Sequence, residues 1–123
     1  MTVQVAIQKA DELRPNTFAE EMKFMWLSEL DGRIKTELFD AHEGFEDREI
    51  PTYIPGNRTN ELFAPEPYTD MYLYWLFMKM DFMNGEIDRF NNDAMMHNTS
   101  WLAFSNYINR NFSPRKKAEI AHV

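Results

Sequence analysis

Apolar residues along this chain recur mainly at intervals of three and four, which is the spacing of one face of an α-helix. Arg14-Pro15 interrupts the first such stretch, because the residue before a proline is disfavoured in the α conformation. The stretches that keep the pattern are residues 2–13, 17–40, 67–83 and 86–110. The pattern therefore predicts an all-α fold, a small helical bundle of about four helices.

The ends and faces of these helices carry more detail. Thr17 and Glu20 match a capping box, in which each side chain accepts the other's backbone N–H, so we expect the second helix to begin at Thr17. The third helix opens at Pro67 and is apolar around most of its circumference, which predicts burial or packing against another subunit. Lys79 falls inside this aromatic face, and we expect it to extend past the rings or to pair with an acid of the second helix.

Residues 40–67 break the helical pattern and contain four of the six prolines. Apolar residues within them, among them Tyr53, Ile54 and Phe63, indicate partial order and are candidate contacts for a partner. A short β-hairpin between "EIPTYI" and "ELFA" is one arrangement open to this long, partly ordered loop. We predict one helical domain over residues 1–112, with this loop at 40–67 and a flexible C-terminal tail at 113–123.

The last helix carries asparagines at regular intervals. Asn84, Asn91 and Asn98 stand seven residues apart, and Asn109 falls on the same arc as Phe90 and Trp101. This spacing predicts that the four amides face the interior, where an unpaired amide costs roughly 1–3 kcal/mol. Their partners would be backbone groups of the 40–67 loop, or a neighbouring subunit in which asparagines set the register. A broken helix with asparagines capping its pieces is the third alternative.

The composition indicates a surface for binding a partner and excludes several kinds of chemical site. Apolar residues make up 44% of the chain, and its 10 Phe, 5 Tyr and 3 Trp exceed what one small core is expected to absorb. The absence of cysteine excludes disulfides, thiolate metal sites and cysteine nucleophiles. No signal peptide is visible, and the longest apolar run, residues 71–78, is too short to span a bilayer. We expect a soluble cytosolic protein without a membrane partner.

The charge is distributed unevenly. The net charge is −7, with −10 over residues 1–93 and +3 over residues 94–123. The acidic body is expected to repel a phosphate backbone, which argues against nucleic-acid binding as the main function. Arg115, Lys116 and Lys117 in the tail are candidate contacts for DNA or an acidic partner, unless the tail is simply solvated.

Familiar catalytic patterns are missing. The chain has no HExxH zinc motif, no GxSxG elbow and no phosphate-binding glycine loop. Asp93 and His97 stand four residues apart on one helix face, a spacing at which the two side chains can share a hydrogen bond. We interpret this pair as a surface contact without a chemical role. Glu37 and Asp40 form the ExxD half of the motif of all-α nucleotide pyrophosphohydrolases, but no ExxE lies upstream at the usual distance. We assign no catalytic residue, metal ligand or cofactor, and keep a Mg²⁺-dependent nucleotide hydrolase as the weakest alternative.

Several spaced blocks carry a resemblance to a known family. They are "EEMKFMWLSELDGRIKTELFD" and "PYTDMYLYWLFMKMDFMNGEIDRFNNDAMMHNTSWLAFSNYINR". Over most of residues 2–114 the chain is similar to a family of short proteins in prophages and tailed phages of Gram-positive bacteria. These proteins resemble the small helical head–tail connector, or adaptor, proteins of the virion.

The resemblance implies a helical bundle that assembles into a homo-oligomeric ring beneath the portal, in the virion or in the host cytoplasm during assembly. It implies contacts with the portal and other virion proteins through an extended loop and a C-terminal tail, here residues 40–66 and 112–123. It implies no active site. The alternative from a different class is a phage-encoded regulator that binds a host protein without a role in the virion.

Overall fold

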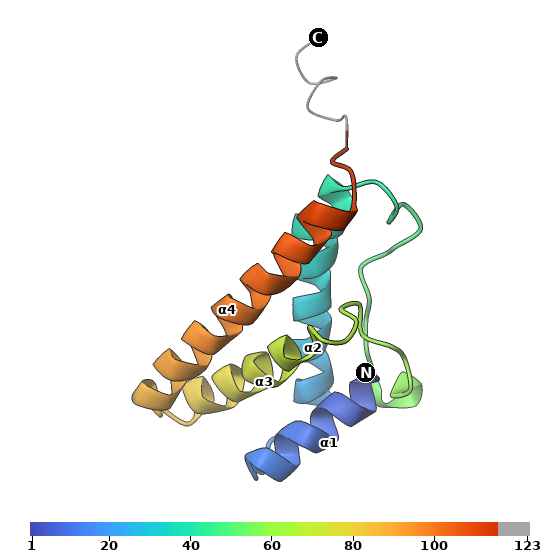
Figure 1. Cartoon of the computed structure of the whole chain (residues 1–123). Helices are drawn as coiled ribbons and strands as arrows, with labels where there is room; N and C mark the ends of the chain where they lie inside the picture. The colour runs from blue at the N-terminus through green and yellow to red at the C-terminus, as the bar shows by residue number, and fades with distance from the viewer. Residues whose placement is uncertain (116–123) are drawn as a thin grey trace.

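The structure, a computed structural model, describes residues 1–115 and confirms the all-α prediction, since no β-strand occurs within them. Figure 1 shows α3 and α4 as a hairpin, with α2 crossing behind it and α1 lying across the lower end. The helices are α1 (Val3–Leu13), α2 (Glu20–Arg33), α3 (Asp70–Met83) and α4 (Ile87–Asn111). Short helical turns follow α2 as η1 (Ile34–Leu38) and η2 (Phe39–Ala41), and interrupt the loop as η3 (Pro55–Asn57).

Helix α3 occupies the centre of the fold, where it packs against α1, α2 and α4. This placement explains why its sequence is apolar on most sides, since three neighbours leave few directions for water. Lys79 behaves as predicted: its ammonium lies 4.7 Å from the Trp75 ring centroid and 3.2 Å from the Glu29 carboxylate of α2. The fully buried side chains of the core include Val3, Phe24, Leu27, Leu30, Ile34, Met71, Tyr72, Leu76, Met80, Phe104 and Ile108.

The predicted capping box at the start of α2 is wrong. Helix α2 begins at Glu20 after an extended Ala19, and no side chain caps it. Asn16 organises the approach instead, because its side chain accepts from the N–H of Phe18 and donates to Asp11 and to the Arg14 carbonyl. An asparagine that bonds its own backbone two residues on forms a turn that competes with helix, which delays the helix start past Thr17.

The predicted β-hairpin in the loop is also wrong. The bonds that the loop makes to itself are local turns, and no backbone hydrogen bond joins residues 49–54 to 61–64. The loop bonds to the beginning of α1 instead: Val3 N–H donates to the Asn60 carbonyl and Gln4 N–H to the Arg58 carbonyl, both at 2.9 Å. The first N–H groups of a helix lack intrahelical acceptors, and the loop carbonyls supply them. The start of α1 therefore competes successfully for the groups that a hairpin would have used.

The start of the predicted tail is held against the other end of the loop. Glu43 N–H donates to the Ser113 carbonyl at 2.8 Å, and Arg115 N–H donates to the Ala41 carbonyl at 3.0 Å. These bonds keep residues 113–115 beside the turn that follows η2. The candidate residues Lys116 and Lys117 lie outside the described residues.

Candidate functional site

The connection between α3 and α4 carries a concentration of exposed apolar side chains. Phe82 and Ile87 are 66% and 68% exposed, and Met83 between them is more than half exposed. Phe90 packs beside Phe82 with ring centroids 5.6 Å apart. We call Phe82, Met83, Ile87 and Phe90 the tip surface. The tight turn below it depends on Gly85, whose positive φ of 70° is a conformation that favours glycine.

The tip surface borders a hollow of about 380 Å³, lined by Asp81, Phe82, Gly85, Ile87, Phe90 and Asn91. Most of its lining is hydrocarbon, and the buried Asp81 is the one acidic residue among those that line it. Large exposed apolar side chains grouped around a hollow are typical of a surface that contacts another protein. The tip surface is therefore the best candidate contact site among the described residues.

An ion cluster lies beneath the tip surface. One guanidinium nitrogen of Arg14 contacts the carboxylates of both Asp81 and Asp93, at 2.9 Å to Asp93. Both aspartates are almost completely buried, whereas Arg14 keeps 28% of its side chain exposed and rests 4.3 Å from the Phe77 ring centroid. Burial and the neighbouring Asp93 carboxyl raise the pKa of Asp81 above its usual range, although Arg14 opposes the rise. The cluster joins the end of α1 to α3 and α4.

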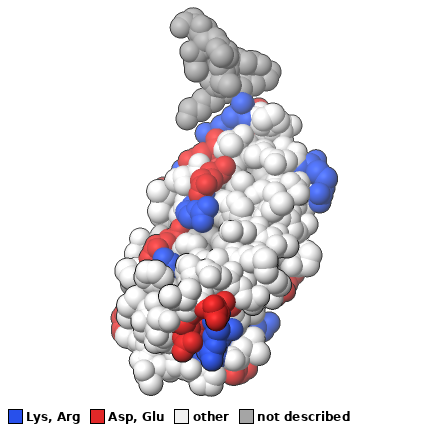
Figure 2. All heavy atoms as spheres, turned by 90° about the vertical axis from the view of Figure 1, so that its left-hand side faces the viewer, with Lys and Arg blue, Asp and Glu red and all other residues white. Residues whose placement is uncertain are grey.

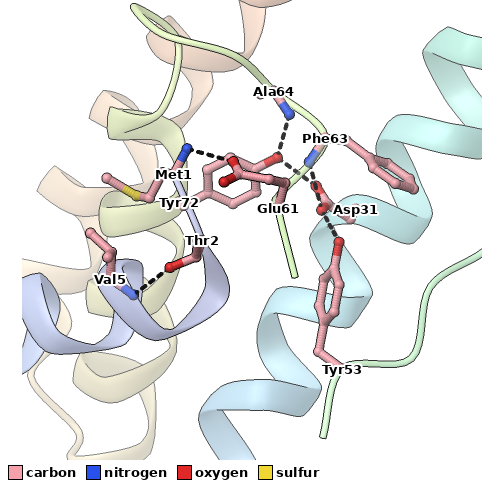
Figure 3. A network of polar contacts seen from close by, with 9 residues as sticks. All are labelled: Met1, Thr2, Val5, Asp31, Tyr53, Glu61, Phe63, Ala64 and Tyr72. Carbon is pink, nitrogen blue, oxygen red and sulfur yellow. Dashed lines mark hydrogen bonds and ion pairs between the residues drawn. The ribbon is translucent and has the colours of Figure 1, made fainter. Parts of the chain in front are cut away.

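A second buried polar network surrounds Asp31, in α2 (Figure 3). The carboxylate accepts a hydrogen bond from the Tyr72 hydroxyl at 2.5 Å, one from the Tyr53 hydroxyl at 2.6 Å and one from the Phe63 N–H at 3.0 Å. The Tyr72 oxygen in turn accepts from the Ala64 N–H at 2.8 Å. One side chain of α2 thus fixes α3 and two separate segments of the loop.

The environment of Asp31 changes its titration. Burial raises the pKa of Asp31 to about 6, while the bonds from Tyr53, Tyr72 and Phe63 act in the opposite direction. Burial and the adjacent carboxylate also raise the pKa of Tyr72 well above its ordinary value. Asp31 and both tyrosines are buried and bonded to one another, so the role of this network is to hold the loop in place.

The predicted inward orientation of the asparagines is wrong. Asn84, Asn91, Asn98 and Asn109 are all exposed. The buried face of α4 instead carries Asp93, His97, Phe104 and Ile108, which at about 100° per residue lie on average more than a third of a turn away from the asparagines. Ile87 and Leu102 are apolar but exposed, so apolar spacing alone indicates the wrong interior direction for this helix.

One asparagine does contact the loop. The Asn109 amide oxygen lies 2.9 Å from one ring nitrogen of the buried His42, whose other ring nitrogen is 2.7 Å from the Leu38 carbonyl. The loop is one of the two expected sources of partners for the amides. Here the partner is a loop side chain, and Asn109 itself is exposed. The alternative of a broken helix holds for Asn84, which is the C-cap of α3. It is wrong for Asn91, Asn98 and Asn109, because α4 is continuous from Ile87 to Asn111.

The other candidate contact residues occupy different environments. Tyr53 is buried and committed to Asp31, so it offers no surface to a partner. Phe63 is partly buried and packs against Phe39 with ring centroids 5.4 Å apart. Ile54 is exposed, and Arg115 is half-buried. Of the loop candidates, Ile54 therefore remains available for contact in the single chain.

The residues considered for chemistry are not brought together. Glu37 pairs with Arg33 at 2.7 Å, and Asp40 pairs with Lys35 at 2.9 Å. The predicted bond between Asp93 and His97 is absent, because Asp93 binds Arg14 and His97 lies 3.2 Å from the Met71 carbonyl. Within residues 1–115, no group of three or more His, Asp or Glu side chains is arranged to hold a metal ion.

Sequence reasoning missed the ion cluster at Arg14 and the polar network at Asp31, although part of the signal was present. Asp31 lies on the same helical arc as Leu27, Leu30 and Ile34, so its burial follows from the apolar stripe of α2. Its partners come from distant segments, and spacing along one helix does not identify them. At Arg14 the sequence pattern predicts only the end of the first helix, and nothing in it indicates a cation shared by two distant aspartates.

Comparison with models of protein families, with curated proteins and with solved structures gave no match. Over the described residues, no helix has the length and apolar character needed to cross a membrane.

Proposed function

We propose that this chain is a morphogenesis protein of a tailed phage or prophage, a head–tail connector subunit that assembles as a ring beneath the portal. In this proposal the protein acts by binding other protein chains, and its contact with the portal or a neighbouring subunit includes the tip surface. The observation that carries the binding role is the exposure of Phe82 and Ile87 at a mainly apolar hollow, with the exposed Met83 next to Phe82 in the chain.

The phage assignment rests on the sequence resemblance described above. Two further features support an assembly role in the virion. The body of the chain is acidic, which suits a channel wall past which DNA must slide without binding. The loop is anchored to α1, α2 and α3 by backbone and side-chain bonds, and so presents Ile54 and the η3 turn in a fixed place.

Replacing Phe82 by aspartate should weaken binding to a portal ring encoded in the same phage or prophage genome by roughly 30-fold, the effect of losing about 2 kcal/mol at a contact hot spot. The charged side chain would have to be desolvated against an apolar partner. Co-sedimentation of the full-length chain with purified portal rings measures this, with light scattering to detect larger assemblies.

Met25→Asp provides the matched control, since Met25 is also half exposed but lies on α2, away from the tip surface. It should bind portal like the parent. A parent chain that stays monomeric and ignores portal rings would contradict the connector role. Capture from a host lysate without incorporation into purified virions would favour the regulator instead.

A further inference from the structure

The side of α4 that faces away from its own core has an unusual composition. From Asn91 to Asn109 its exposed residues carry no charge. These residues, which we call the α4 outer face, are Asn91, Asn92, Met95, Asn98, Thr99, Leu102, Ala103, Asn106 and Asn109. A helix side that remains in water normally carries many charged residues, and depletion of charge is the signature of an interface core.

The α4 outer face is also accessible. Met95 and Leu102 are 60% and 59% exposed. In Figure 1 no other described segment lies along the upper-left side of α4. Figure 2, which views the molecule from that side, shows a long surface without charged side chains running up the molecule. The folded chain leaves this face open along most of the helix.

The spacing of the face fits helix pairing. Asn91 and Asn98 stand seven residues apart, and Met95 and Leu102 follow each of them by four. Alternating steps of four and three form the seam of a coiled coil, in which an asparagine specifies register and the apolar residues supply packing. A primary amide carries both donors and an acceptor, so two such faces can bond to each other. The pattern points to a second helix of the same kind.

Charge at the two ends of the face selects the direction of that second helix. Asp88 stands seven residues before Met95 and Arg110 stands seven residues after Ala103, so these two charges lie in line with the face at its N-terminal and C-terminal ends. Glu86 and Arg89, also at the N-terminal end, do not follow this line. A parallel pair would bring like charges together at both ends, whereas an antiparallel pair places each acidic end beside a basic one. Antiparallel helices also oppose their macrodipoles favourably.

We propose that two copies of this chain pair through their α4 outer faces, antiparallel, about a two-fold axis near Asn98 and Thr99. In this register Met95 meets Leu102, Asn91 meets Asn106, and Asp88 lies within one residue of Arg110 of the second copy. A two-fold contact uses the same patch on both copies and closes on itself. The pairing does not rest on the connector role, because a chain that ignores the portal can still form it.

The contact should be reversible. From Asp88 to Arg110 the face is about 33 Å long at 1.5 Å rise per residue, and roughly 10 Å wide. That corresponds to an area of about 330 Å² per copy, below the roughly 800 Å² per partner of a standard stable complex. We expect single chains and pairs in equilibrium, shifting toward pairs as concentration rises.

Cysteine cross-linking tests both the contact and its direction, because the chain has no cysteine of its own. Asn98→Cys should form a disulfide-linked dimer under mild oxidation on the order of tenfold faster than exposed Thr59→Cys, since pairing raises the effective concentration of the two thiols. Asn91→Cys should not, because its two copies would lie about 22 Å apart along the antiparallel helices. Equal cross-linking at 91 and 98 would overturn the antiparallel arrangement, and no excess at 98 over 59 would overturn the contact.

Opposite charges introduced at positions 95 and 102 give a second test, in which mixing the two variants should restore pairing. Met95→Glu and Leu102→Lys should each abolish concentration-dependent dimer formation in sedimentation equilibrium, while melting temperatures stay near the parent's because both sites are exposed. Mixing the two variants should restore a mixed dimer, in which the introduced carboxylate of one copy meets the introduced ammonium of the other. Dimers in either variant alone, or no recovery on mixing, would contradict the proposed pairing. Portal binding by Leu102→Lys separates this result from the fate of the connector proposal.

Discussion

Replacing Arg14 by methionine should destabilise the folded chain by about 3–5 kcal/mol, because two buried carboxylates then lose their cation. Asp81 and Asp93 are almost completely buried, and Arg14 contacts both. Methionine keeps much of the packing against Phe77 while removing the charge. The loss should be smaller at pH 5 than at pH 8, because unpaired neighbouring carboxyls take up a proton more readily.

Urea unfolding followed by circular dichroism measures this loss. Arg33→Met is the matched control: Arg33 also lies over an aromatic ring, 4.6 Å from the Trp101 centroid, and pairs with an acid, but its side chain is more exposed. Its loss should stay below about 1 kcal/mol. Adding Asp81→Asn to the Arg14 variant should recover part of the stability. A loss within about 1 kcal/mol for Arg14→Met itself would mean that the ion cluster does not hold α1 in place.

The advantage of the parent chain over Asp31→Asn should grow by about 2 kcal/mol as the pH falls from 7 to 4. In the folded chain the pKa of Asp31 is raised to about 6 from an ordinary value of 3.8. Between these values the folded state binds more protons than the unfolded state. The stability from this group is therefore complete below about pH 4 and is lost as the pH rises through 6.

Urea midpoints of both proteins at pH 4, 5, 6 and 7 test this difference. Asp81 titrates in the same direction, and burial lowers the pKa of His97 with the opposite effect on stability. Both groups are present in parent and variant, so their contributions cancel in the comparison. A direct NMR titration of the Asp31 carboxyl should have its midpoint near pH 6. A difference that stays constant across the range would show that Asp31 titrates normally.

The helices could be predicted because their cause is local. Apolar spacing located α1, α3 and α4 to within a few residues, and it placed the end of the second helical stretch correctly near residue 40. The predicted start of α2 is wrong because Asn16 makes a local hydrogen bond that competes with the capping box. The predicted hairpin in the loop is wrong because the loop pairs with the start of α1, which lies nearly sixty residues away in sequence.

The interior direction of α4 was harder to predict than its existence. Its apolar residues lie on two sides of the helix, Phe104 and Ile108 toward the core and Met95 and Leu102 toward water. If all of these apolar residues are assigned to one face, the inferred interior direction lies between the two sides and matches neither. The asparagines lie on the outer side with Met95 and Leu102, whereas the buried polar residues are Asp93 and His97. Two apolar sides on one helix are themselves a sign of two contacts.

The contacts that hold α1 in place come from residues far along the sequence, and this affects the order in which the chain folds. Helices α3 and α4 are joined by a tight turn and can meet early, whereas α1 depends on Asn60, Asp81 and Asp93. During synthesis α1 leaves the ribosome first, yet its ion cluster is incomplete until residue 93 has followed. We expect α1 to dock last and to open first, with faster amide hydrogen exchange than α3. Equal protection of α1 and α3 would instead indicate that the whole bundle opens as one unit.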